Sequence, residues 1–173
     1  MKMLKVLMLT ASIFIVQMLA AQNPAISTRY SDSEIAQMVE GYRMAHARDI
    51  VPPNNLQQKF LTDFPNASDV EWETAGSIYE VDFEIRSRDF KAFYDSESNL
   101  LMGVEEIHIS ALPAVVKNAA EAKYPKFRIE DIRKIRRGTE TVYKVEMEKS
   151  FSDMEVTLFV KSDGIVLNER IDY

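Results

Sequence analysis

The chain has 173 residues and a formal net charge of −6, with 46% hydrophobic and 28% charged residues. This balance is typical of a globular protein with a buried core. The acidic surplus argues against nucleic acid and anionic lipid as partners, because both are negatively charged. The sequence has no cysteine, which excludes disulfides, thiol nucleophiles, zinc–thiolate sites and a cysteine-linked lipid anchor.

The first 21 residues have the pattern of a secretory signal peptide. Lys2 and Lys5 precede an apolar stretch over residues 6–19. Small residues follow it, and cleavage is expected between Ala21 and Gln22. The apolar stretch is shorter than the roughly 20 residues of a membrane-spanning helix, although an uncleaved anchor helix is the alternative. We therefore expect a periplasmic or secreted protein with no membrane span after cleavage.

Residues 22–53 are predicted to form a polar leader and an N-terminal helix. A serine followed by an acidic first turn indicates a helix start at Ser31. Apolar residues then recur at helical spacing, with His46 expected to be half-buried at the end of this helix. Consecutive prolines at 52 and 53 end the segment.

The remaining chain shows one pattern twice, over residues 54–110 and 111–173. Each copy has a short helical stripe, ending at Phe64-Pro65 or Tyr124-Pro125, and then four alternating segments. Successive strands joined by short turns pair antiparallel, and their apolar faces need cover. We predict an α+β fold of two tandem helix-plus-four-stranded-antiparallel-sheet units, with the helices packed on one face of the sheet.

Short motifs mark the two halves: Phe64-Pro65, Val70-Glu71-Trp72-Glu73, Tyr79-Glu80-Val81-Asp82-Phe83, Phe93-Tyr94-Asp95, Leu112-Pro113, Tyr124-Pro125 and Lys161-Ser162-Asp163-Gly164. In these motifs both halves resemble the PepSY-like domains of bacterial periplasmic proteins, which are similar to β-lactamase-inhibitor-protein folds. The first half departs at its last turn, where residues 96–99 replace the family's Asp-Gly, which predicts a looser first hairpin. The resemblance implies an exported binding or inhibitory module that restrains a peptidase or another envelope protein. It brings no catalytic residues and no cofactor.

Histidines offer little support for a metal site. Glu106 and His108 are expected to share one face of a strand over residues 100–109. A transition-metal site usually needs three or four protein ligands, so a solvated edge strand is the favoured interpretation.

Carboxylate pairs are the other candidates for chemistry. Glu80 with Asp82, and Glu146 with Glu148, are predicted to lie on solvated strand faces, whereas glycosidase-type catalysis needs two carboxylates in a cleft. The basic run at 133–137 is expected to be a solvated strand end and loop, because nucleic-acid binding needs a basic face with aromatics. We predict that the protein is not an enzyme, and an acid-residue hydrolase is the weakest alternative.

Phe93 and Phe159 occupy matching positions in the third strand of each repeat. Alternation turns both away from the helices, onto a face that is otherwise charged. Since aromatics dominate binding hot spots, we predict a partner-binding surface centred on them. The alternatives are packing under the N-terminal helix or across a homodimer. The sequence thus favours an exported, non-enzymatic binding or inhibitory module over a structural homo-oligomeric envelope protein.

Overall fold

The computed structural model describes residues 24–172, so the expected signal peptide lies outside the described residues. The elements, in chain order, are α1 (Asp32–Met44), β1 (Arg48–Asp49), α2 (Asn54–Asp63), β2 (Ser68–Ala75), β3 (Ile78–Glu84), β4 (Asp89–Asp95), β5 (Leu100–Glu106), the 3-10 turn η3 (Ile109–Ala111), α3 (Ala114–Lys123), β6 (Phe127–Arg137), β7 (Glu140–Lys149), β8 (Glu155–Lys161) and β9 (Val166–Asp172).

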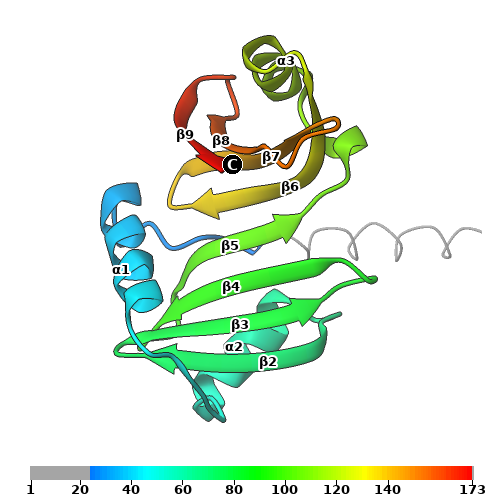
Figure 1. Ribbon diagram of the computed structural model, residues 1–173. Coiled ribbons are helices and arrows are strands. Elements are labelled where there is room, and N and C mark those ends of the chain that lie inside the picture. Colours follow the sequence, from blue (N-terminus) through cyan, green and yellow to red (C-terminus); the bar gives the residue numbers. More distant parts are fainter. Residues whose placement is uncertain (1–23, 173) are drawn as a thin grey trace, which may run out of the picture.

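The strands form one nine-stranded sheet whose spatial order follows the chain from β1 to β9 (Figure 1). Every neighbouring pair is antiparallel. We call α2 with β2–β5 the first unit, and α3 with β6–β9 the second unit. The predicted order of one helix and four strands is confirmed in each, and the pairing of β5 with β6 joins them into a single sheet.

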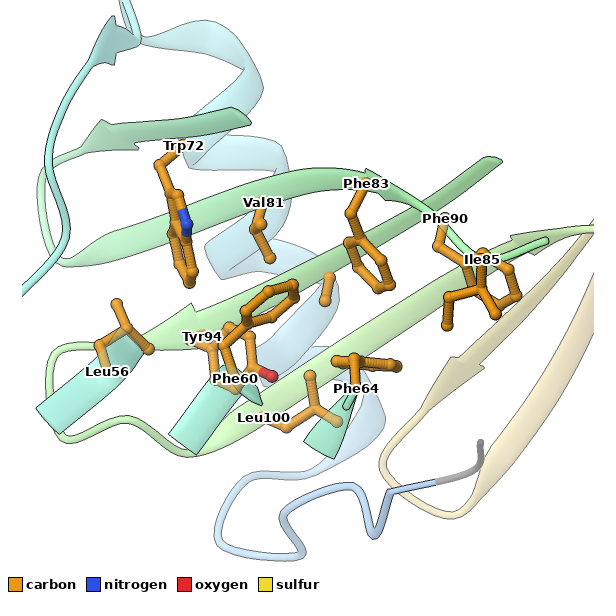
Figure 2. Close-up of a cluster of buried hydrophobic side chains, with 11 residues drawn as sticks. Leu56, Phe60, Phe64, Trp72, Val81, Phe83, Ile85, Phe90, Tyr94 and Leu100 are labelled. Carbon is orange, nitrogen blue, oxygen red and sulfur yellow. The ribbon is translucent and has the colours of Figure 1, made fainter. Parts of the chain in front are cut away.

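The first unit buries an aromatic core between α2 and the sheet (Figure 2). Proline precedes α2, where its missing N–H costs nothing. Leu56, Phe60 and Phe64 then fall on one helix face at a spacing of four. The Phe60 ring lies 5.0 Å from the Phe83 ring and 5.3 Å from that of Trp72, both in edge-to-face geometry. Such contacts add to the burial energy of each ring.

The second unit repeats this arrangement with aliphatic residues. Val116 and Ala120 of α3 lie on Val145, Leu158 and other residues of β6–β9. Leu158 is fully buried while Glu155 is exposed. The predicted alternation toward the helix and toward water is therefore confirmed at Leu158 and Glu155. Thr157, on the side of β8 away from α3, is buried nevertheless.

Helix α1 packs on the opposite face of the sheet, at the left in Figure 1. A capping box starts it, because the Ser31 hydroxyl accepts from the Glu34 amide and the Glu34 carboxylate accepts from the Ser31 amide. Its buried face consists of Ile35, Val39 and Tyr42. The helix ends at Met44, so His46 is exposed beyond it and the expectation of a half-buried His46 was wrong.

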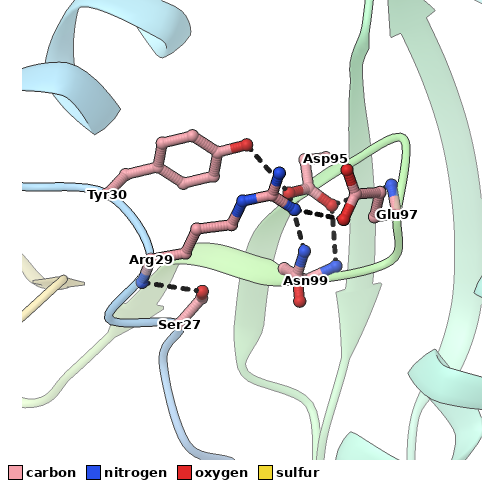
Figure 3. A network of polar contacts seen from close by, with 6 residues as sticks. All are labelled: Ser27, Arg29, Tyr30, Asp95, Glu97 and Asn99. Carbon is pink, nitrogen blue, oxygen red and sulfur yellow. Dashed lines mark hydrogen bonds and ion pairs between the residues drawn. The ribbon is translucent and has the colours of Figure 1, made fainter.

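The leader fastens α1 to the turn between β4 and β5 (Figure 3). Buried Asp95 accepts hydrogen bonds from the Glu97 and Asn99 amides, and the Tyr30 hydroxyl donates to it at 3.4 Å. Arg29 forms an ion pair with Glu97. The turn that departs from the family's Asp-Gly is thus held by its own carboxylate rather than loosened.

The two units share their irregularities of strand pairing. The register shifts at Phe93/Tyr94 in the first unit and at Phe159/Val160 in the second. The first strand of each unit also carries a shift. Because bulges are specific features of a fold, these matches fix which residues are equivalent. The repeat boundaries at 54–110 and 111–173 stay predictions.

One local expectation was wrong, and a second was wrong in part. Strand β5 ends at Glu106, and His108 precedes the η3 turn, where its Nδ1 accepts from the Ser110 amide. A histidine side chain that bonds a nearby backbone amide favours a turn over a strand. The basic run at 133–137 is the C-terminal end of β6, as expected, but it is paired on both sides and does not continue into a loop.

The β8–β9 turn provides a stability prediction. Gly164 has φ +90°, and an added Cβ would lie 2.9 Å from Val115 Cγ2 and 3.2 Å from the Val115 carbonyl oxygen. We expect Gly164→Ala to lower the free energy of unfolding by about 2 kcal/mol or more, because strain and collision add. Gly76, with φ +64° and nothing within 4 Å, is the control, and its alanine variant should lose only about 1 kcal/mol. Equal losses in urea denaturation would show that Val115 does not crowd the turn.

Candidate binding surface

The sheet face opposite α2 and α3 is covered by α1 over the first unit. Phe93 is only 1% exposed, and its ring lies 5.8 Å from the Tyr42 ring in edge-to-face geometry. Ile78, Leu101 and Met102 complete the buried apolar patch beneath α1. The apolar residues packed with α1 come from β2 to β6, and none of the described residues of β7–β9 is among them.

Phe93 is therefore not part of an exposed surface, which corrects its predicted place on an open sheet. Alternation did turn it away from α2, as expected, but α1 occupies the space in front of it. Of the interpretations open at the sequence level, packing under the N-terminal helix is the one found for Phe93.

A polar network borders this patch. The Tyr42 hydroxyl donates to Glu73 at 3.0 Å, and Lys91 forms an ion pair with Glu80 and a second with Asp82 at 3.2 Å. Burial disfavours the Lys91 ammonium, but the hydrogen bond and charge of Glu80, helped by Asp82, outweigh it and raise the pKa of Lys91. Burial and the charges of Glu80 and Glu73 raise the pKa of Tyr42.

This network corrects a second expectation. Glu80 is 6% exposed rather than solvated. Its carboxylate forms an ion pair with Lys91 and lies near Tyr42 of α1. These are the surroundings of a structural ion pair rather than of an acid catalyst. The alternation of the strand did not predict the burial of Glu80, because the sequence did not indicate where α1 packs.

The equivalent face of the second unit has a different composition. We call it the open face, and its residues are Arg133, Lys144, Thr157, Phe159, Asn168 and Arg170. Strand pairing makes Phe159 the equivalent of Phe93, because Phe93 lies opposite Glu80 and Phe159 opposite Lys144. By the same pairing, Asn168 takes the place of Met102. Phe159 is half-buried, Thr157 beside it is buried and Asn168 is exposed.

Opposite charges are paired on and around the open face. Lys144 forms an ion pair with Glu146, and Arg133 Nε lies 3.2 Å from Asp131. Asp131 and Glu146 lie directly opposite each other on β6 and β7. Burial and the Glu146 carboxylate raise the pKa of Asp131 even though Arg133 opposes this; burial also acts on Glu146, but Lys144 outweighs it and lowers the pKa of Glu146. One aromatic ring within a charged border is a common composition for a protein interface.

Two exposed apolar residues escaped the sequence interpretation. Leu167, at the position equivalent to buried Leu101, is 49% exposed, and Phe151 at the β7–β8 turn is fully exposed with φ +62°. Leu167 could have been found from the repeat, since it follows the second turn as Leu101 follows the first. The exposure of Phe151 has no signal in the alternation pattern.

His108, a candidate metal ligand together with Glu106, has no metal-binding surroundings among the described residues. His108 is exposed, and its Nδ1 lies 2.9 Å from the Ser110 hydroxyl. Within residues 24–172, no group of three or more His, Cys, Asp or Glu side chains could hold a metal ion. No helix in this range is long and apolar enough to cross a membrane.

Solved structures with the same fold come from Bacteroides. A DUF2874 family protein from Bacteroides uniformis has a TM-score of 0.63 and 19% identity, over 70% of this chain and 90% of its own. A protein from Bacteroides eggerthii described as "putative periplasmic proteins" has a TM-score of 0.64 and 17% identity, over 70% and 90%. A BLIP-like protein from Bacteroides fragilis has a TM-score of 0.59 and 26% identity, over 70% and 88%.

The curated proteins contain no match to the chain. The family described as "Putative beta-lactamase-inhibitor-like, PepSY-like" matches twice in tandem, at residues 26–102 and 103–168. The second match begins within β5, the strand through which the two units join. Together with the tandem fold, these two matches show that the chain belongs to the beta-lactamase-inhibitor-like, PepSY-like family.

Proposed function

We propose that this protein is an exported, non-enzymatic module of the cell envelope that binds or inhibits a partner protein through its open face. The partner is an envelope protein, such as a peptidase. The expected signal peptide over residues 1–21 supports export, and a structural neighbour described as periplasmic supports the same compartment.

The unequal cover of two equivalent sheet faces is the observation that carries this proposal. In the first unit, Phe93 and Met102 are buried because α1 of the same chain covers them. In the second unit, Phe159 remains half-exposed among charged residues, and no described residue of β7–β9 belongs to the apolar cluster packed with α1. A fold that accepts a covering element on one face has the geometry to accept one on the equivalent face.

The distribution of carboxylates supports a role in binding rather than catalysis. Glu80 is paired with Lys91, and Glu146 with Lys144. Charges held in such pairs are suited to fix the orientation of a partner, since complementary charges contribute specificity and association rate.

The test is recovery of a partner from native envelope extract by cross-linking and pull-down. We expect Phe159→Ser to weaken binding of the recovered protein by about 30-fold, because an aromatic hot spot is worth about 2 kcal/mol. Phe151→Ser is the matched control, since it removes a fully exposed phenylalanine outside the open face. It should leave the same partner bound.

Once the partner is identified, its affinity for the wild type and for each folded variant should be measured with purified proteins. Equal affinity of wild type and Phe159→Ser would refute the open face as the binding site. Loss of binding in Phe151→Ser alone would move the site to the β7–β8 turn.

A further inference from the structure

The two edges of the sheet differ in how their outer strands are covered. At the first edge, β1 pairs with β2, and the Ile50 amide donates to the Trp72 carbonyl at 3.1 Å. The segment after α1 thus covers residues 72–74 of β2 at this edge. At the second edge, β9 has β8 on one side, and no strand within residues 24–172 lies on the other (Figure 1). An open edge of this kind is a template for another strand.

The backbone at the centre of β9 indicates which groups face outward. The Glu169 amide donates to the Asn168 side-chain oxygen at 2.8 Å rather than to β8. In an antiparallel ladder, successive residues alternate between facing the neighbouring strand and facing away from it. The amide and carbonyl of Ile171 therefore also face outward, and its side chain is 38% exposed.

The end of β9 is complementary to itself. If two copies pair antiparallel about Ile171, each Ile171 lies opposite the partner's Ile171. Each Arg170 then lies opposite the partner's Asp172, and this pair occurs twice. Within one chain, Arg170 Nε lies 2.9 Å from Asp172, and the two side chains are 66% and 55% exposed, so this ion pair lies at the surface, where its members can exchange partners across the edge.

Another register is disfavoured by charge. Pairing centred on Glu169 would lose both Arg170–Asp172 pairs, and opposite charges stabilise a strand pair. It would also place two Glu169 carboxylates opposite each other, each already held by Lys123 of its own chain at 3.1 Å. The charge pattern thus selects both a second copy of this chain and one register.

We propose that β9 is the dimerisation edge of this protein, with two copies paired antiparallel about Ile171. The two sheets then become continuous. Because the two-fold axis of such a pair is perpendicular to the sheet, both open faces lie on the same side of the dimer. The short edge buries less area than a standard interface, so the dimer is weak and concentration-dependent.

Sedimentation of the exported chain from about 1 µM to about 1 mM tests the proposal. We expect the average mass to rise from monomer toward dimer. Ile171→Pro should raise the dimer dissociation constant about 10-fold or more, because proline removes the outward N–H yet is tolerated at a sheet edge. Arg170→Asp should weaken the dimer similarly, and adding Asp172→Arg should restore it.

Controls keep this test separate from the proposed function. Phe159→Ser should dimerise like the wild type, and the circular dichroism of each variant should match it. If Ile171→Pro disturbs the fold, the comparison of Arg170→Asp with the double variant Arg170→Asp, Asp172→Arg tests the proposal instead. The proposal would be overturned if the chain stays monomeric over the whole concentration range. It would also be overturned if these variants leave the dimer dissociation constant unchanged, or if β9 pairs only with a different protein.

Discussion

Phe93→Ala is expected to lower the free energy of unfolding by about 3–5 kcal/mol, whereas Phe159→Ala at the equivalent position should lower it by about 1 kcal/mol. Phe93 is enclosed between the sheet and Tyr42 of α1, so its removal leaves a cavity. Phe159 is half-buried with no helix over it, so water replaces most of what is lost. Urea denaturation of the two variants and the wild type measures the difference.

The same pair of variants shows whether α1 is docked in solution. If the two alanine variants lose equal stability, α1 does not cover Phe93. Ile35→Ala supplies a check from the helix side, because Ile35 is fully buried in the same cluster. It should lose about 2–5 kcal/mol.

Phe60→Ala is expected to cost about 3–5 kcal/mol, which is a large part of the stability of a domain. The Phe60 ring is 2% exposed and contacts the rings of Phe64, Trp72 and Phe83. Leu61→Ala is the control on the same helix, because Leu61 is 49% exposed and should cost less than about 1 kcal/mol.

Fluorescence gives this prediction a second readout. Trp72 is the single tryptophan of the chain, and it lies beside Phe60. The emission of the native state should therefore shift in Phe60→Ala and stay unchanged in Leu61→Ala. Comparable stabilities for the two variants would contradict the placement of Phe60 at the centre of the first core.

The sequence predicted the tandem units because their signals are local. The alternation of residues 79–86 and 154–160 indicates which side of each strand is buried, and it can be recognised without knowing how distant segments pack. The turns at Asp95–Asn99 and at 161–164 fixed the strand ends for the same reason.

The errors arose where a residue's surroundings depend on distant segments. Alternation placed Phe93 and Glu80 on the second face of the sheet but could not tell that α1, from residues 32–44, covers that face. His46 and His108 both lie just past an element end, and element boundaries are uncertain by one or two residues from sequence alone. Phe159 is outside the apolar cluster that packs with α1, and its role in binding stays a prediction.

Thiol labelling tests most directly whether two equivalent faces differ in cover. The chain has no cysteine, so Met102→Cys and Asn168→Cys each carry one thiol, at paired positions beneath α1 and on the open face. Under native conditions, maleimide should modify Asn168→Cys at least about 100-fold faster, because Met102 becomes accessible only when α1 opens. Equal rates in folded variants would contradict the covered first face and the open second one.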